Sequence, residues 1–251
     1  MSVVDSQGEG SLSALPDGLA IYAIGDLHGR LDLLRAMETL IGADLARSRP
    51  KKSVEIFLGD YIDRGPQSRE LVERLIGSPP IAKERICLIG NHEDMLLDAL
   101  AEPEGFANWL HNGGDATLAS YGLNVRPFAA KAELARIRAA FPDHLPPNHR
   151  AFFEGLRRWV EFGPYLFVHA GIRPGRPLVE QDPEDLIWIR EPFLLSDEDF
   201  GRIVVHGHTP VDDPEVRRNR INVDTGAYFT GCLTCLVLEQ GKRRFLQTGQ
   251  R

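Results

Sequence analysis

Three short apolar segments in the first ninety residues each end in a glycine and then a side chain that can bind a metal. They read Ala-Ile-Gly-Asp at 23–26, Phe-Leu-Gly-Asp at 57–60 and Leu-Ile-Gly-Asn at 88–91. A helical pattern follows each segment, which is typical of parallel strands joined by crossover helices. The carboxyl ends of such strands open on one edge of the sheet. The sequence therefore predicts an α/β domain in which Asp26, Asp60 and Asn91 converge.

The apolar periodicity changes character along the chain. Helical stripes between 31 and 45 and between 71 and 76 predict the first two crossover helices. Strand patterns vanish between 94 and 160, where the sequence predicts successive helices. This helical insertion lies between two polar motifs, so we expect it to border the functional site. Strand-like runs return between 159 and 247 and imply a second sheet.

Each polar motif extends into further reactive side chains. The first three read Gly-Asp-Leu-His-Gly at 25–29, Gly-Asp-Tyr-Ile-Asp-Arg-Gly at 59–65 and Gly-Asn-His-Glu at 90–93, and His-Ala-Gly at 169–171 and Gly-His-Thr-Pro at 207–210 follow later. Carboxylate, amide and imidazole ligands together suit two divalent first-row metals such as manganese, iron or zinc, whereas calcium would require oxygen ligands alone. The set points to a dinuclear centre in which one carboxylate is shared between the ions.

The order and spacing of these motifs resemble the calcineurin-like metallophosphoesterases. Within that family, the motifs at 59–65, 90–93, 169–171 and 207–210 resemble the bacterial and bacteriophage lambda-type phosphoprotein phosphatases. The resemblance covers about residues 20 to 240, with further matches at 109–122, 186–191 and 221–227. It implies two facing mixed sheets flanked by helices, and hydrolysis of phosphoserine or phosphothreonine by a metal-bridging hydroxide.

The resemblance also implies a set of metal ligands. Asp26 and His28 would hold the first ion, Asp60 would bridge both, and Asn91, His169 and His208 would hold the second. Two ions about 3.5–4 Å apart lower the pKa of a shared water toward about 7. Manganese is the ion that we expect first, with iron or zinc as alternatives. His206 competes with His208 as a ligand, and the resemblance favours His208.

Four further residues receive catalytic roles from the resemblance. In the family, a carboxylate that matches Asp63 orients an imidazole that matches His92, and the imidazole protonates the leaving alkoxide. The guanidinium groups of Arg64 and Arg190 match the oxygens of a phosphate. Asp224 also resembles a family position near the site, and its role stays open.

Two other functions remain as alternatives. One is a diadenosine tetraphosphate hydrolase, which cleaves a phosphoanhydride. Such hydrolases typically lack the aspartate that matches Asp63, so its presence favours a phosphoprotein or a small phosphomonoester as substrate. The other is a metal-binding scaffold without activity, against which the intact His92 and Arg64 argue.

Composition limits the partners and the compartment. The 251 residues carry a formal net charge of -7 and no long basic run, so nucleic acid is not an expected partner. Residues 1–18 predict a disordered tail without the features of a signal peptide, and no stretch is apolar enough for a membrane span. We therefore expect a cytoplasmic protein without a membrane partner, formed by one domain over 19–251 with its helical insertion at 94–160.

Overall fold

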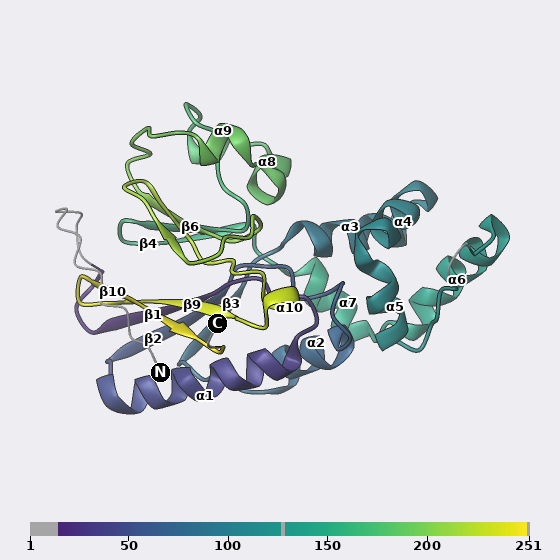
Figure 1. Ribbon diagram of the computed structural model, residues 1–251, viewed down its shortest axis with the longest axis horizontal. Coiled ribbons are helices and arrows are strands. Elements are labelled where there is room, and N and C mark those ends of the chain that lie inside the picture. The colour runs from purple at the N-terminus through teal and green to yellow at the C-terminus, as the bar shows by residue number, and fades with distance from the viewer. Residues whose placement is uncertain (1–14, 127–128, 250–251) are drawn as a thin grey trace.

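Two five-stranded sheets face each other in the computed structural model, which describes residues 15–126 and 129–249 (Figure 1). Most of the predicted tail, residues 1–14, lies outside the described residues. The first sheet has the order β10-β9-β1-β2-β3, with β1 (Leu19–Ile24), β2 (Lys52–Phe57), β3 (Glu84–Cys87), β9 (Thr234–Glu239) and β10 (Lys242–Gln247). The second has the order β4-β5-β6-β8-β7, with β4 (Trp159–Phe162), β5 (Tyr165–Val168), β6 (Ile203–His206), β7 (Glu215–Val216) and β8 (Arg220–Asn222).

Both faces of the first sheet are covered, which explains the continuous apolar run of β1. Tyr22 and Ile24 pack toward α1 (Leu31–Ser48) and α2 (Ser68–Gly77), whereas Ile21 and Ala23 pack against the second sheet. Alternate residues of a strand face opposite sides, so a strand covered on both faces must be apolar throughout. The strands β1, β2 and β3 are parallel, as the sequence predicted.

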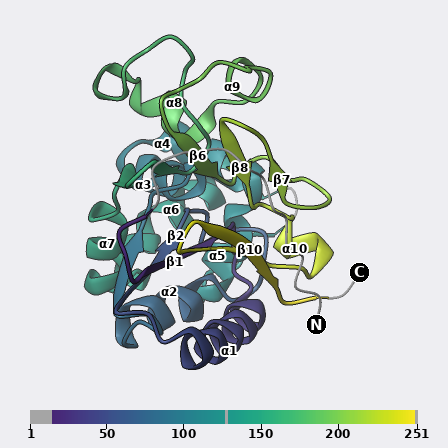
Figure 2. The same ribbon diagram turned by 90° about the vertical axis from the view of Figure 1, so that its left-hand side faces the viewer.

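The outer face of the second sheet carries its own helices. Leu166 and Val204 of this sheet pack with Ile187 and Phe193, which belong to α8 (Pro183–Trp188) and α9 (Glu191–Leu194). Helix, sheet, sheet and helix therefore stack in four layers, which the second view also shows (Figure 2). The predicted fold class, two facing mixed sheets flanked by helices, is confirmed.

The last two strands return to the first sheet. β9 pairs antiparallel with β1, and β10 pairs with β9. The sequence indicated these strands but not their sheet, because pairing between segments more than 200 residues apart leaves no local pattern. The short strand β7 was not predicted, since two residues cannot display a period.

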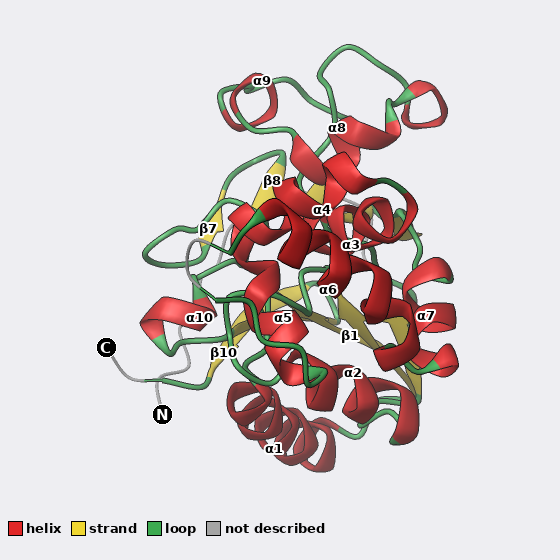
Figure 3. Ribbon diagram, turned by 90° about the vertical axis from the view of Figure 1, so that its right-hand side faces the viewer, coloured by secondary structure: helices red, strands yellow, loops and turns green. Residues whose placement is uncertain are grey.

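Helices fill the chain between the two sheets. They are α3 (Asn91–Ala101), α4 (Pro103–Trp109), α5 (Asp115–Ser120), α6 (Lys131–His144) and α7 (Pro147–Glu154), with the distorted turn η1 (Leu110–Gly114) between α4 and α5. They lie together at one end of the sheets (Figure 3). Their buried aromatic residues, among them Trp109 and Phe141, join the apolar core that also contains α1 and α2. Among the described residues, no helix is both long and apolar enough to span a membrane.

Candidate metal centre

The polar motifs meet where strands of both sheets end. Asp26 and His28 follow β1, Asp60 follows β2, Asn91 opens α3 after β3, His169 follows β5 and His208 follows β6. All six side chains are buried. The structure therefore brings the six predicted metal ligands to one place, although they come from segments more than 180 residues apart.

One half of the site gathers around the amide oxygen of Asn91. This Oδ1 atom lies 3.0 Å from Nε2 of His169 and 2.9 Å from Nδ1 of His208. Oδ1 of Asp60 lies 3.5 Å from Nε2 of His169. Ligand atoms about 2 Å from an ion lie about 3 Å from one another, so these four donors have the spacing of a metal site.

The other half contains His28, Asp60 and His92, whose ligand atoms all lie within 4.8 Å of one another. Oδ2 of Asp60 lies 3.4 Å from Nε2 of His28 and 3.9 Å from Nε2 of His92. Asp26, predicted as a ligand here, turns its carboxylate toward the backbone N–H of His208 at 3.1 Å. Asp26 nevertheless lies close enough to Asp60 for the charge of Asp60 to raise the pKa of Asp26, and His92 is a further imidazole beside Asp60.

Two glycines and one glutamate fix the loop that carries Asp60. A Cβ on Gly59, whose φ is 114°, would lie 2.6 Å from the backbone nitrogen of Gly90, so only glycine lets these loops approach so closely. The carboxylate of Glu93 accepts hydrogen bonds from the backbone N–H groups of Gly90 at 2.9 Å, Asp60 at 2.9 Å and Tyr61 at 2.8 Å. These bonds hold Asp60 in the uncommon left-handed conformation, with φ of 53°.

Burial sets the charges of the site. Burial lowers the pKa of His28 to about 3 and that of His208 to about 2, so both imidazoles are neutral at physiological pH. For Asp60, burial acts in the opposite sense, but the surrounding histidines, His169 first, bring its pKa below the usual range. Neutral imidazoles around an ionised carboxylate are the form that binds divalent metals. The donor set therefore fits such ions.

A pair of carboxyl groups adjoins this centre. Burial raises the pKa of Asp26 well above its usual value, and the neighbouring Asp224 raises it further. The pKa of Asp224 is also raised, to about 6, chiefly by burial, although its Oδ1 accepts a hydrogen bond from the N–H of Gly226 at 2.9 Å. Two buried carboxylates this close repel each other, so a cation beside them would favour ionisation of both. Asp224 is thus an electrostatic neighbour of the predicted ligand Asp26.

His92 also forms a buried pair with Asp63. Nδ1 of His92 lies 2.7 Å from Oδ2 of Asp63, whose side chain is fully buried. Burial alone would lower the pKa of His92, but the carboxylates of Asp60 and Asp63 raise it above the ordinary value. The indole Nε1 of Trp109 and the hydroxyl of Thr117 donate to the same carboxylate. Sequence analysis assigned no role to either residue, although both lie in the segment 109–122 that carries part of the family resemblance.

The two predicted phosphate-binding arginines lie on the two halves of the site. Nη1 of Arg64 is 2.9 Å from Nε2 of His28, and Nε of Arg190 donates to Nε2 of His208 at 3.2 Å. The guanidinium carbon of Arg64 also lies 5.0 Å from the ring centroid of Tyr228, in α10 (Ala227–Thr230). Tyr228 is a further residue near the site that sequence analysis did not identify.

His206 points away from the site. Its ring packs edge-to-face on Phe193, with ring centroids 5.0 Å apart, and its Nδ1 lies 3.1 Å from the carbonyl oxygen of Gly207. Only His208 of this motif shares a possible metal-binding group with Asp60 and His169. The geometry is therefore consistent with the predicted preference for His208 as the ligand.

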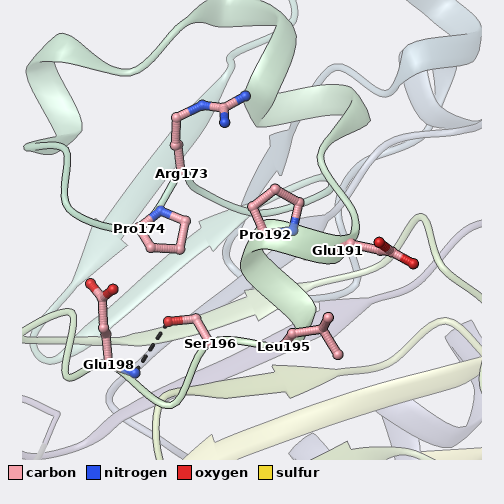
Figure 4. Close-up of a pocket in the computed structure, with 7 residues that line it drawn as sticks. All are labelled: Arg173, Pro174, Glu191, Pro192, Leu195, Ser196 and Glu198. Atoms are coloured by element: carbon pink, nitrogen blue, oxygen red, sulfur yellow. Dashed lines mark hydrogen bonds between the residues drawn. The ribbon is translucent and has the colours of Figure 1, made fainter.

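A shallow cleft of about 670 Å³ opens beside α9, immediately after Arg190 (Figure 4). Its lining consists of Arg173, Pro174, Glu191, Pro192, Leu195, Ser196 and Glu198. Arg173 is bound through two hydrogen bonds of 2.6 Å to Asp185, which neutralises its charge. The two glutamates make this cleft unsuited to phosphate, and it contains none of the predicted site residues.

Comparison with known proteins shows the family to which the chain belongs. Residues 19–231 match the family model of the calcineurin-like phosphoesterases. The chain is 36% identical to serine/threonine-protein phosphatase 2 of Escherichia coli, over 85% of this chain and 90% of the relative. It is 28% identical to the bis(5'-nucleosyl)-tetraphosphatase PrpE of Halalkalibacterium halodurans, over 85% and 87%. A solved cold-active protein-tyrosine phosphatase from a Shewanella species shares the fold, with a TM-score of 0.59 at 15% identity, over 97% and 87%.

Proposed function

The chain belongs to the calcineurin-like phosphoesterases, and we propose that it is a phosphomonoesterase acting on phosphoserine or phosphothreonine. The family depends on a dinuclear metal centre, and the chain carries histidine and aspartate groups that could bind metal. We assign Asp26, His28, Asp60, Asn91, His169 and His208 as ligands of two divalent ions, manganese first among the candidates, with iron and zinc next. Such ions supply an activated water and neutralise the charge of the phosphate.

The buried pair of His92 and Asp63 carries the proposal. The alkoxide of serine or threonine is a poor leaving group, so its departure requires a proton from a general acid. Asp63 fixes Nδ1 of His92 at 2.7 Å, and this bond leaves Nε2 turned toward Asp60, at 3.9 Å, in the middle of the site. This orientation supports His92 as the group that would protonate the leaving oxygen of a substrate.

Arg64 and Arg190 complete the proposed site as phosphate-binding residues. Each guanidinium group lies beside a different proposed ligand, His28 in one case and His208 in the other. A planar guanidinium donates two parallel hydrogen bonds to phosphate oxygens and stays charged at any relevant pH. The two arginines would thus hold a phosphate from both halves of the centre.

Hydrolysis of dinucleoside polyphosphates is the second candidate, because relatives named PrpE match the chain over most of its length. When a phosphoanhydride is cleaved, the leaving group is a stabilised phosphate anion, which needs no general acid. The intact Asp63, fully buried beside His92, therefore favours the monoester.

We also propose that residues 19–251 form one domain with the helical insertion at 94–160.

Steady-state kinetics on both substrate classes tests the proposal. We expect kcat/KM for phosphoserine or phosphothreonine peptides to exceed that for diadenosine tetraphosphate at least about tenfold, equivalent to about 1.4 kcal/mol. The assays use the metal, among manganese, iron and zinc, that gives the highest rate. A preference for the dinucleotide would overturn the monoesterase assignment. Failure to hydrolyse either substrate or p-nitrophenyl phosphate with any of the three metals would favour a binding scaffold.

A further inference from the structure

We propose that Trp109 and Thr117 are positioning residues for the acid pair, and that they adapt the site to phosphate esters of weakly acidic alcohols. Both residues belong to the helical insertion at 94–160. The inference rests on the proposed function, because it assumes that His92 protonates a leaving group. It gives the insertion a chemical role, in addition to the predicted position of the insertion at the border of the functional site.

The carboxylate of Asp63 receives hydrogen bonds on both oxygens. Thr117 donates to Oδ1 at 2.6 Å, His92 Nδ1 lies 2.7 Å from Oδ2, and the indole of Trp109 lies 3.0 and 2.9 Å from the two oxygens. All four side chains are at most 1% exposed. Side chains of the insertion thus supply two of these three donor groups, and the third is the imidazole that they help to orient.

Thr117 also fixes the backbone of Asp63. Its hydroxyl accepts a hydrogen bond from the N–H of Asp63 at 2.8 Å while it donates to the carboxylate of the same residue. Asp63 has a left-handed backbone with φ of 69°, which is uncommon for a residue with a side chain. A single hydroxyl that binds both the backbone N–H and the carboxylate of Asp63 therefore restrains the backbone and the side-chain rotation of this residue together.

Packing prevents the indole of Trp109 from turning away. Its ring stacks on Phe141 with centroids 5.5 Å apart. Gly114 also approaches the ring so closely that a Cβ there would lie 2.6 Å from two ring carbons. Closely packed side chains keep one rotamer, so Nε1 stays directed at Asp63. The glycine at 114 is thus explained by the place of the indole.

The hydrogen bonds of Trp109 and Thr117 reach Asp63 and Ser68 but none of the proposed metal ligands. Removing either donor should therefore act on the proton delivered by His92 and leave the metals bound. General acid catalysis contributes about 10² to 10⁴-fold for a poor leaving group and little for a good one. We expect losing one of three donors to lower kcat about tenfold for alkyl phosphates, and to change it little for p-nitrophenyl phosphate.

The test compares Thr117→Val and Trp109→Phe with wild type on a series of phosphate esters, from nitrophenyl to alkyl leaving groups. Each variant should make kcat fall more steeply as the leaving alcohol becomes less acidic. Thr117→Ser, which keeps the hydroxyl, should restore the wild-type dependence. Ser68→Ala is the matched comparison and should keep the wild-type dependence, because Ser68 contacts the N–H of Asp63 and the hydroxyl of Thr117, each at 3.1 Å, but not the carboxylate of Asp63.

Metal content and the thermal unfolding midpoint are measured for every variant. If Thr117→Val is not folded, Thr117→Ala replaces it, because it removes the same hydroxyl. An equal loss on all esters, or no loss, in folded and metal-loaded variants would overturn the positioning role alone. Failure of the wild type to hydrolyse any phosphomonoester would instead overturn the proposed function, so the two failures are distinguishable.

Discussion

Replacing Tyr228 with leucine should weaken phosphate binding through Arg64. The guanidinium carbon of Arg64 lies 5.0 Å from the centroid of the Tyr228 ring, within the range of a cation–π interaction. The backbone that carries the ring is restrained, since Nη1 of Arg30 donates to the carbonyl oxygens of Ala227 at 3.0 Å and Tyr228 at 3.3 Å. Tyr228 therefore offers Arg64 a fixed aromatic face at the rim of the site.

The size of the effect follows from the exposure of the ring. Cation–π interactions contribute about 0.5–1 kcal/mol at exposed sites and about 2 kcal/mol when desolvated. Tyr228 is 36% exposed, so we take about 1 kcal/mol, which corresponds to about a fivefold change in a binding constant. The leucine variant should therefore raise the inhibition constant of inorganic phosphate about fivefold.

The assay is competitive inhibition of p-nitrophenyl phosphate hydrolysis by inorganic phosphate. Tyr228→Phe keeps the aromatic face and should behave as wild type, whereas Tyr228→Leu keeps apolar bulk without the face. Equal weakening in both variants would show that the hydroxyl or the packing matters instead. An unchanged inhibition constant in the leucine variant would refute the reasoning, because Arg64 would then need no aromatic support.

Three further predictions concern the histidines and the bridging carboxylate. Asp60→Asn should lose both ions and His208→Ala should lose one, whereas His206→Ala should keep both. Metal analysis after desalting tests this prediction. Loss of metal from the His206 variant alone would reverse the ligand assignment. His92→Asn should keep its metals and lower kcat about 10² to 10⁴-fold on alkyl phosphates but less on aryl phosphates, and equal losses would count against an acid role. Burial lowers the pKa of His206 to about 3 from 6.5, so the unfolded chain binds more protons in this interval and the free energy of unfolding falls as the pH drops below 6.5. His206→Gln should flatten that dependence by up to about 1.4 kcal/mol per pH unit in denaturant titrations, and an unchanged slope would contradict it.

The sequence predicted the parts of the fold that depend on local pattern. The strands β1, β2 and β3 were readable because each is a short apolar run that ends in glycine and a polar residue. Parallel pairing then required their ends to share one edge, which brought Asp60 and Asn91 together without knowledge of the rest of the fold. Period and connection rules are sufficient for such a prediction.

Contacts between distant segments were not predictable in the same way. Trp109 and Thr117 are 46 and 54 residues from Asp63 in sequence, and a buried tryptophan or threonine more often serves packing alone. The approach of Tyr228 to Arg64 likewise depends on tertiary packing. No periodicity in the sequence indicates such contacts, because they follow from how complete helices and strands pack.

The division of the site between sheets and insertion bears on its specificity. The proposed ligands lie at the ends of sheet strands, whereas Asp63 is held by side chains from the helical insertion. Changes in those helices could therefore alter the protonation of the leaving group without disturbing the proposed ligands. Relatives named as a serine/threonine phosphatase and as a tetraphosphatase each match 85% of this chain, so overall similarity does not decide between the two substrate classes.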